Sequence, residues 1–283
     1  DKSSRVRGMS EYELFGDCRQ LCTVEGNNSC ESILEAVSET NQYATEACPD
    51  VQNSYDFGVD PQTGEQAYFG MFYQQIPGTT TYRYLTKTLG RYTLSEPLKA
   101  LFDQYPKDKR MRTLIKNFNN GFGNRNMEVY SCGKYADSTI FNRDLTDAKY
   151  SRAHFKMIRL AEVMLTYAEA MNEYNNGPDA DAKDYLRRIR ERAGIMDAEI
   201  PADYEGFKEA VEVERRKELY FEGYRWFDLV RRNQLTTMVP KAKSRVNYRI
   251  VPTVLEKHYL FLIPNAAYPF NSQLGPNNPG GLQ

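Results

Sequence analysis

The sequence has few of the residues on which metal and acid–base chemistry most often depend. Two histidines, His154 and His258, lie far apart, and neither paired CxxC nor HxxxH spacing occurs, so we expect no tetrahedral zinc site. No GxSxG, HExxH, P-loop or GxGxxG motif stands in the context that its chemistry needs. We therefore expect no catalytic residues, no metal and no cofactor.

The net charge is also small, and long apolar runs are missing. The formal net charge is −1, so the chain has no general attraction to nucleic acid or to an anionic membrane. No run approaches 18 apolar residues, and the first ten residues lack the hydrophobic region of a signal peptide. Hydrophobic residues make up 41% of the 283 residues, which is enough to build the core of one large domain or two ordinary ones.

The five cysteines are an odd number, and all of them lie in the first half of the chain. In an exported protein they would allow one or two disulfides. In a reducing compartment they would act as small buried apolar residues. The sequence leaves both possibilities open for Cys18, Cys22, Cys30, Cys48 and Cys132.

Helical periodicity dominates the second half of the chain. We predict helices over 155–175, 179–193 and 203–222, with Gly194 capping the second, and a shorter helix from about 224. Earlier helices are predicted at 10–22, starting at Ser10, and at 94–105. Residues 27–39 fit either a strand or a helix, and LFLIP at 260–264 is typical of a short buried strand.

Between residues 40 and 95 this periodicity is lost, and aromatic residues are frequent. The protein has 21 Tyr and 14 Phe, and sugars expose C–H faces that stack on flat rings. We interpret this stretch as a ligand-facing surface, against the alternative of a tyrosine-rich packing loop. The candidate ligand-binding residues are Tyr55, Tyr68, Phe69, Phe72, Tyr73, Tyr82, Arg83 and Tyr84.

Within this surface, Tyr82 and Tyr84 rank highest. They flank Arg83 just after a Pro77-Gly78 turn, and an extended segment would direct both rings to the same side. An alternative would be a glycoside hydrolase that uses two carboxylates of the same stretch. Its candidate residues are Asp50, Asp56, Asp60 and Glu65.

The most informative stretch is ERRKELYFEGYRWFDLVRR, at 214–232. Its charges recur every three or four residues, which on a helix places them on one stripe of mixed sign. A general acid needs a raised pKa, whereas neighbouring arginines favour the ionised carboxylate. We therefore predict a structural network rather than an acid–base pair, made by Arg215, Glu218, Glu222, Arg225 and Asp228.

This stretch resembles the motif ERR-x-EL-x-FEG-x-R-x-FDL-x-R near the carboxyl end of SusD/RagB proteins, the nutrient-binding lipoproteins of the Gram-negative cell surface. Three further stretches resemble the family in the same order: FKMIRLAEVMLTYAEAMNEYN at 155–175, YLRRIRERAGI at 185–195, and LFLIPNAAYPFNSQLGPNNPGG at 260–281. The last departs from the family pattern, because Gly281 replaces the final tyrosine.

The resemblance implies a mainly α fold, a SusD-like superhelix of tetratricopeptide-like hairpins with long loops and a few short strands. It also favours a strand within 27–39. It implies that 1–283 is the carboxy-terminal portion of such a protein, with a loop-rich, ligand-facing region at 1–150 and a helical block at 151–283.

The resemblance further implies function and location. The protein would capture an oligosaccharide, or a peptide as some relatives do, and deliver it to a SusC-type TonB-dependent transporter without catalysis. It would be held at the outer membrane by an N-terminal lipid anchor that this chain does not contain. A helical interaction scaffold is the remaining alternative.

Overall fold

The computed structural model describes residues 12–37, 73–75, 82–84, 94–117, 129–135, 153–241, 254–271 and 273–274. Within these residues the protein is mainly α, as predicted. Its helices are α3 (Glu96–Asp103), α5 (Leu160–Asn175), α6 (Ala180–Arg192), α7 (Tyr204–Glu218), α8 (Tyr224–Arg231) and α9 (Leu235–Met238). Short 3₁₀ turns lie at Val24–Gly26, Lys109–Thr113, Val239–Lys241, Glu256–Tyr259 and Asn265–Phe270.

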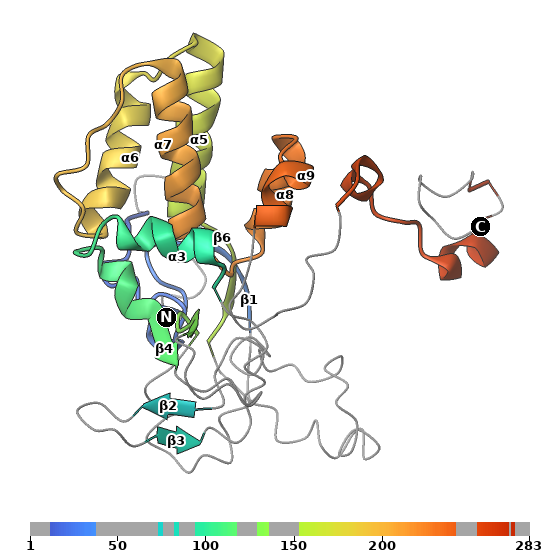
Figure 1. The fold of residues 1–283 in the computed structure, drawn as a ribbon, viewed down its shortest axis with the longest axis horizontal. Helices are drawn as coiled ribbons and strands as arrows, with labels where there is room; N and C mark the ends of the chain where they lie inside the picture. Colours follow the sequence, from blue (N-terminus) through green and yellow to red (C-terminus); the bar gives the residue numbers. More distant parts are fainter. Residues whose placement is uncertain are drawn as a thin grey trace.

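The largest unit is a bundle of α5, α6 and α7 standing side by side (Figure 1). Alanines of α5 and α6 let the helices approach closely, while larger side chains of all three fill the space between them. The Asp179 side chain accepts a hydrogen bond from the Ala182 N–H at 2.7 Å and caps α6, and Asp203 does the same for α7. The buried cluster consists of Ala161, Met164, Leu165, Ala168, Ala182, Leu186, Ile189, Phe207 and Val211.

Two helix boundaries differ from prediction. The helix expected from residue 155 begins at Leu160, because Phe155–Arg159 forms strand β6. The helix expected to reach residue 222 ends at Glu218. Phe221 (φ 60°) and Gly223 (φ 88°) adopt left-handed backbone conformations between α7 and α8, and these conformations cannot continue a right-handed helix.

The strands form three antiparallel pairs. β1 (Ser32–Ala36) pairs with β6, β2 (Tyr73–Gln75) with β3 (Tyr82–Tyr84), and β4 (Leu114–Asn117) with β5 (Val129–Cys132). β1 decides the ambiguity over 27–39 in favour of a strand. The β1–β6 ribbon ends directly at α5, so it joins the amino-terminal segment to the base of the helical bundle (Figure 1).

Two further predictions are wrong. Residues 12–22 form an extended segment and turns instead of a helix, because the Glu13 N–H donates to the Cys30 carbonyl and the Phe15 N–H to the Glu31 carboxylate. Those donors are therefore engaged by a later part of the chain. Residues 260–264 form no strand and are largely exposed.

The four cysteines in the described part of the chain, Cys18, Cys22, Cys30 and Cys132, are free thiols. Cys18, Cys22 and Cys132 are buried, and the last two belong to a second apolar cluster with Phe102 and Tyr220. Burial raises the pKa of the Cys22 thiol to about 11, so it stays protonated near neutral pH. No helix among the described residues is long and apolar enough to span a bilayer.

Candidate functional site

Two features bear on function: the ribbon of β2 and β3, and a buried network of charges at the carboxyl end of α7. The ribbon pairs Tyr73 with Tyr84, Gln74 with Arg83, and Gln75 with Tyr82. The sequence prediction that 82–84 is extended is confirmed. Tyr82 and Tyr84 occupy alternate positions of one strand. Together with Tyr73 on the paired strand, three of the predicted aromatic residues lie in this two-stranded ribbon.

The other predicted ligand-binding residues lie outside the described residues. They are Tyr55, Tyr68, Phe69 and Phe72, and the same holds for the carboxylates of the glycosidase alternative, Asp50, Asp56, Asp60 and Glu65. The structure therefore brings together Tyr73, Tyr82, Arg83 and Tyr84. The role of all eight residues in binding stays a prediction.

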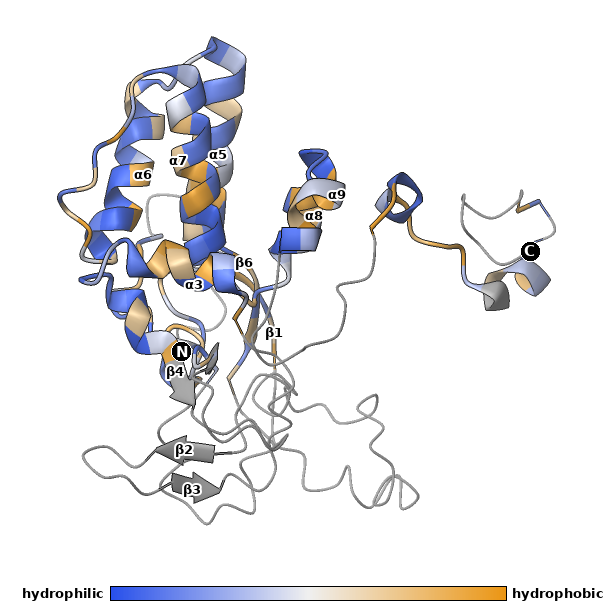
Figure 2. Ribbon diagram, in the orientation of Figure 1, coloured by the Kyte–Doolittle hydropathy of each residue, from blue (hydrophilic) through white to orange (hydrophobic). Residues whose placement is uncertain are grey.

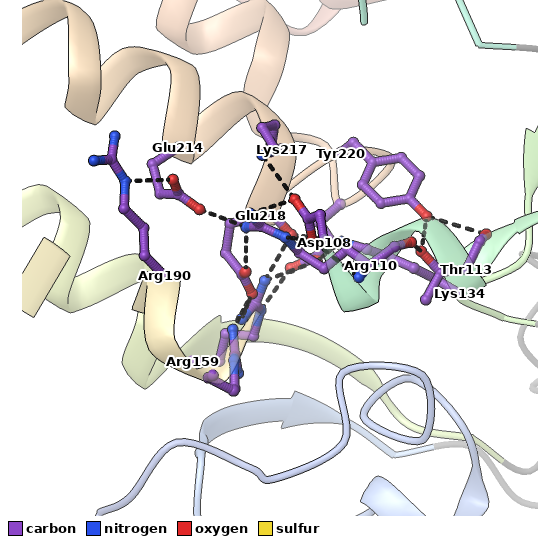
Figure 3. A network of polar contacts seen from close by, with 12 residues as sticks. Asp108, Arg110, Thr113, Lys134, Arg159, Arg190, Glu214, Lys217, Glu218 and Tyr220 are labelled. Carbon is purple, nitrogen blue, oxygen red and sulfur yellow. Dashed lines mark hydrogen bonds and ion pairs between the residues drawn. The ribbon is translucent and has the colours of Figure 1, made fainter. Parts of the chain in front are cut away.

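The second feature, called here the ion-pair network, lies where α7 ends against β6, α6 and the segment before β4 (Figure 3). All of its members have buried side chains, an arrangement in which each charge needs a partner. The anions are Glu31, Asp108, Glu214, Glu218 and Glu222, and the cations are Arg110, Lys134, Arg159, Arg190, Arg192 and Lys217.

Glu218 is the most connected carboxylate. Its Oε1 accepts from Arg159 Nη1 at 2.8 Å and from Arg192, and its Oε2 accepts from Arg110 Nη1 at 3.0 Å. Three guanidiniums from three different segments thus converge on the last residue of α7. This arrangement fixes the end of α7 against β6, α6 and the turn that follows Asp108.

Arg159, the last residue of β6, is the corresponding centre among the cations. It donates to the carboxylates of Glu31 at 2.6 Å, Glu218 at 2.8 Å and Glu222 at 2.8 Å. A guanidinium offers five N–H donors in a rigid fork, which suits several carboxylates at once. Lys134 is the second cation that pairs with the Glu222 carboxylate, and its Nζ lies 4.2 Å from the centre of the Tyr220 ring.

A second branch of the network runs through Asp108. Its carboxylate accepts from Arg110 Nη2 at 2.9 Å and pairs with Lys217 Nζ at 2.7 Å. Arg110 also reaches Glu214, at 2.6 Å. The branch therefore continues along the buried face of α7 by one turn from Glu218.

These contacts control the protonation of the carboxylates. Burial alone would raise the pKa of Glu218, but Arg192, Arg159 and Arg110 outweigh it and hold that pKa well below its usual value. The pKa of Glu222 is lowered in the same way, by Arg159 and Lys134 against burial. A carboxyl that stays ionised at neutral pH donates no proton, so the geometry suits a network that joins segments rather than an acid–base pair.

The predicted single stripe of charges over 214–232 is wrong, because α7 ends at Glu218. Arg215 and Asp228 pair with each other at 3.3 Å and share no partner with Glu218 or Glu222 among the contacts of the described residues. Arg225 is partly exposed and lies 3.5 Å from Glu212. The structural role predicted for these five residues stays a prediction.

Several members of the network were not identified from the sequence. Arg159 and Arg192 lie in stretches that resemble the family, but only apolar periodicity was used there. Glu31 lies in the stretch 27–39, whose pattern fits either a strand or a helix, and Lys134 lies in a segment for which no element was predicted. No group of His, Cys, Asp and Glu within the described ranges could hold a metal ion.

The chain belongs to the SusD family, whose model matches residues 104–274, more than half of the sequence. It is also similar to individual members. SusD-like protein P2 of Formosa agariphila is 32% identical over 148 residues, which cover 47% of this chain and 27% of that protein. SusD-like protein P25 of the same organism is 36% identical over 111 residues, covering 38% and 21%.

Solved structures share the fold. A SusD homologue from Bacteroides thetaiotaomicron superposes with a TM-score of 0.66 at 20% identity, covering 96% of this chain and 57% of that one. Surface glycan-binding protein A of the same species, in complex with laminarihexaose, gives 0.66 at 18% identity, covering 95% and 56%. A laminarin-binding SusD-like protein gives 0.67 at 22% identity, covering 97% and 55%. The chain thus spans about a quarter of the curated relatives and about half of these structures.

Proposed function

We propose that this chain is the carboxy-terminal portion of a cell-surface protein that captures an oligosaccharide, with 1–150 facing the ligand and 151–283 forming the helical block. The observation that carries the proposal is the β2–β3 ribbon, where the register sets Tyr73 beside Tyr84 and Arg83 beside Gln74. Aromatic rings stack on the C–H faces of sugars, while arginine and amide groups reach the hydroxyls at the rim.

Family membership supports the class of protein. Two of the structural neighbours carry glycan binding in their names, one in complex with laminarihexaose and one described as laminarin-binding. In this proposal the captured glycan passes to a SusC-type TonB-dependent transporter, and a lipid anchor holds the whole protein at the outer membrane. The protein performs no catalysis, and the ionised carboxylates of the network serve the fold.

Binding should be weak, because a polar ligand at an open surface loses hydrogen bonds to water on binding. Weak binding also suits a protein that must release its cargo. The first experiment screens the chain against glycans that include laminarihexaose, and calorimetry then measures the ligand found. We expect the Tyr82→Ala/Tyr84→Ala double variant to lose at least about tenfold in affinity, or about 1.4 kcal/mol.

Tyr174→Ala is the matched control, because that ring is 85% exposed on α5 and lies outside the aromatic stretch. Its affinity should equal that of the wild type. Wild-type affinity in the double variant would contradict the assignment and return Tyr82 and Tyr84 to packing roles. Glycan cleavage would contradict the proposed absence of catalysis, and binding of peptides alone would replace the ligand class.

A further inference from the structure

The two faces of the β2–β3 ribbon differ in composition. Its three cross-strand pairs follow one another without a register shift, so the alternation of residues can be followed across both strands. Alternate residues of a strand share a face, and so do the two members of each pair. One face, called here the tyrosine face, therefore carries Tyr73, Gln75, Tyr82 and Tyr84. The opposite face carries Gln74 and Arg83.

The spacing on the tyrosine face suits two neighbouring units of a chain-like ligand. Tyr82 and Tyr84 are two positions apart on β3, which separates them by about 7 Å along the strand. Tyr73 is the cross-strand partner of Tyr84, and such partners have Cβ atoms about 5 Å apart. Gln75 holds the corresponding position beside Tyr82. The face thus consists of one row with two tyrosines and a second row with one tyrosine and one amide.

The two faces also differ in charge. Arg83 is the one charged residue among these six, and it belongs to the opposite face. Tyrosine and glutamine side chains carry no charge near neutral pH. A ligand carboxylate or sulfate would meet no cation among the residues of the tyrosine face, and it would lose hydration without compensation. The composition of the tyrosine face therefore favours a ligand without charge.

The helical bundle offers acidic ligands a different kind of surface. Hydrophilic residues prevail along α6 (Figure 2), and they include several arginines of its last three turns. The Arg187 side chain of this helix is 50% exposed. Attraction of an acidic glycan to exposed arginines of this kind would be sensitive to salt. Salt dependence can therefore separate such attraction from binding at the tyrosine face.

We propose that the tyrosine face binds two consecutive units of a neutral oligosaccharide, and that Gln75 contacts a hydroxyl of the unit stacked on Tyr82. The inference rests on the proposed function and names its ligand class and its polar contact. An amide both donates and accepts hydrogen bonds, as sugar hydroxyls do. Stacking tolerates many sugars, whereas a placed hydrogen bond distinguishes them. Gln75 is thus the residue that determines specificity, and Gln74 and Arg83 do not contact the ligand.

Calorimetry on the 283-residue chain tests the ligand class. The probes are laminarihexaose, maltohexaose and xylohexaose as neutral hexasaccharides, and hexagalacturonate as an acidic one. We expect a neutral hexasaccharide to bind, with an affinity that changes by less than about twofold between about 50 and 500 mM salt. Hexagalacturonate should not bind. Binding of hexagalacturonate alone, weakened by salt and by Arg83→Ala, would overturn the inference.

A matched set of variants tests the polar contact. Gln75→Ala should lower the affinity for the bound neutral hexasaccharide by at least about threefold, because a hydrogen bond is lost. Gln75→Leu keeps most of the side-chain size and should show the same loss. Gln74→Ala, one position away on the opposite face, and Arg83→Ala should change the affinity by less than about twofold. Arg187→Ala on α6 is the control for a general effect of positive charge.

Specificity gives a readout that a purely structural role would not change. Gln75→Ala should reduce the differences in affinity among the neutral hexasaccharides, whereas Gln74→Ala should preserve them. Circular dichroism should show the same melting temperature for the variants and the wild type. Binding that depends on Gln74 or Arg83 instead of Gln75 would overturn this inference and leave glycan capture in place. Failure of all four hexasaccharides to bind would contradict the proposed function and the inference together.

Discussion

Both halves of α7 are buried, one by apolar packing and the other by ion pairs. Its amino-terminal half packs Phe207 and Val211 against apolar residues of α5 and α6. Its carboxy-terminal half buries Glu214, Lys217 and Glu218 in the ion-pair network. Apolar burial is non-directional and tolerates repacking, whereas a buried charge is stable only while each partner stays in place.

The difference has a consequence for what each half specifies. The apolar half fixes the proximity of three helices that follow one another in the sequence. The charged half selects particular partners from segments before α5, such as Asp108 and Arg110. The amino-terminal half of α7 thus packs in the core of the bundle, whereas its carboxy-terminal half connects segments that are distant in the sequence.

The largest expected effect is in the apolar half. Phe207→Ala removes a fully buried ring and leaves a cavity among three helices, which should cost about 4 kcal/mol of unfolding free energy. Urea unfolding followed by circular dichroism measures it. Phe227→Ala, at an exposed ring on α8, serves as the control and should change stability by less than about 0.5 kcal/mol in this chain. A loss below about 1 kcal/mol for Phe207→Ala would mean that α7 is not held by this core.

The second effect concerns the charged half. Glu218→Ala leaves Arg110, Arg159 and Arg192 without their shared carboxylate, and we expect a loss of about 3 kcal/mol. Glu209→Ala, on an exposed position of the same helix, is the control. Thermal unfolding and ligand calorimetry should be read together. Unchanged melting with abolished glycan binding would show that Glu218 belongs to the site instead of to the fold.

Acid should weaken the charged half before the apolar one. The folded-state pKa values of Asp108, Glu218 and Glu222 lie below their unfolded values. Their contribution is therefore complete above the unfolded pKa and is lost as pH falls through the folded pKa. We expect stability to fall by on the order of 2 kcal/mol from pH 5 to pH 3.

Denaturant midpoints at pH 7, 5, 4 and 3 measure this loss. The Glu218→Gln protein is the informative comparison, since it has one fewer carboxylate to protonate. Its stability should be lower at pH 7 and should decline less steeply toward pH 3. Parallel curves for the two proteins would argue against a depressed pKa at Glu218.

The smallest effect is expected at Arg225. This residue was predicted to belong to the same network as Glu218, but its side chain is partly exposed and its pairing with Glu212 is long, at 3.5 Å. Exposed ion pairs contribute little, so Arg225→Ala should cost less than about 1 kcal/mol. The difference in melting temperature from wild type should also shrink at high salt. A loss as large as that of Glu218→Ala would indicate that Arg225 belongs to the same network as Glu218.

Local signals in the sequence were sufficient for the helices. Apolar spacing and the capping residue Gly194 located α6 closely, because both are local signals. The end of α7 was missed, since nothing in its composition reveals the left-handed backbone of Phe221. The segment 12–22 was misassigned because its N–H donors are taken by Cys30 and Glu31, a tertiary effect invisible to helical periodicity.

The candidate site could be predicted only in part. The charge spacing over 214–232 identified Glu218 and Glu222, and the tyrosine-rich composition identified the stretch that contains the β2–β3 ribbon. The partners of Glu218 lie 26 to 108 residues away along the chain, and no spacing rule connects residues at such distances. Pairings of this kind follow from how the segments pack, which a single sequence does not display.

The separations within the ion-pair network also bear on the order in which the protein folds. Arg159 and Glu31 are 128 residues apart in sequence, and Arg192 and Glu31 are 161 apart. Closing such loops costs more chain entropy than docking α5, α6 and α7, which are consecutive. We expect the bundle to assemble first and the charges to meet last, when water leaves the space around Glu218. During folding, the carboxyl end of α7 would then stay hydrated until the amino-terminal segment arrives.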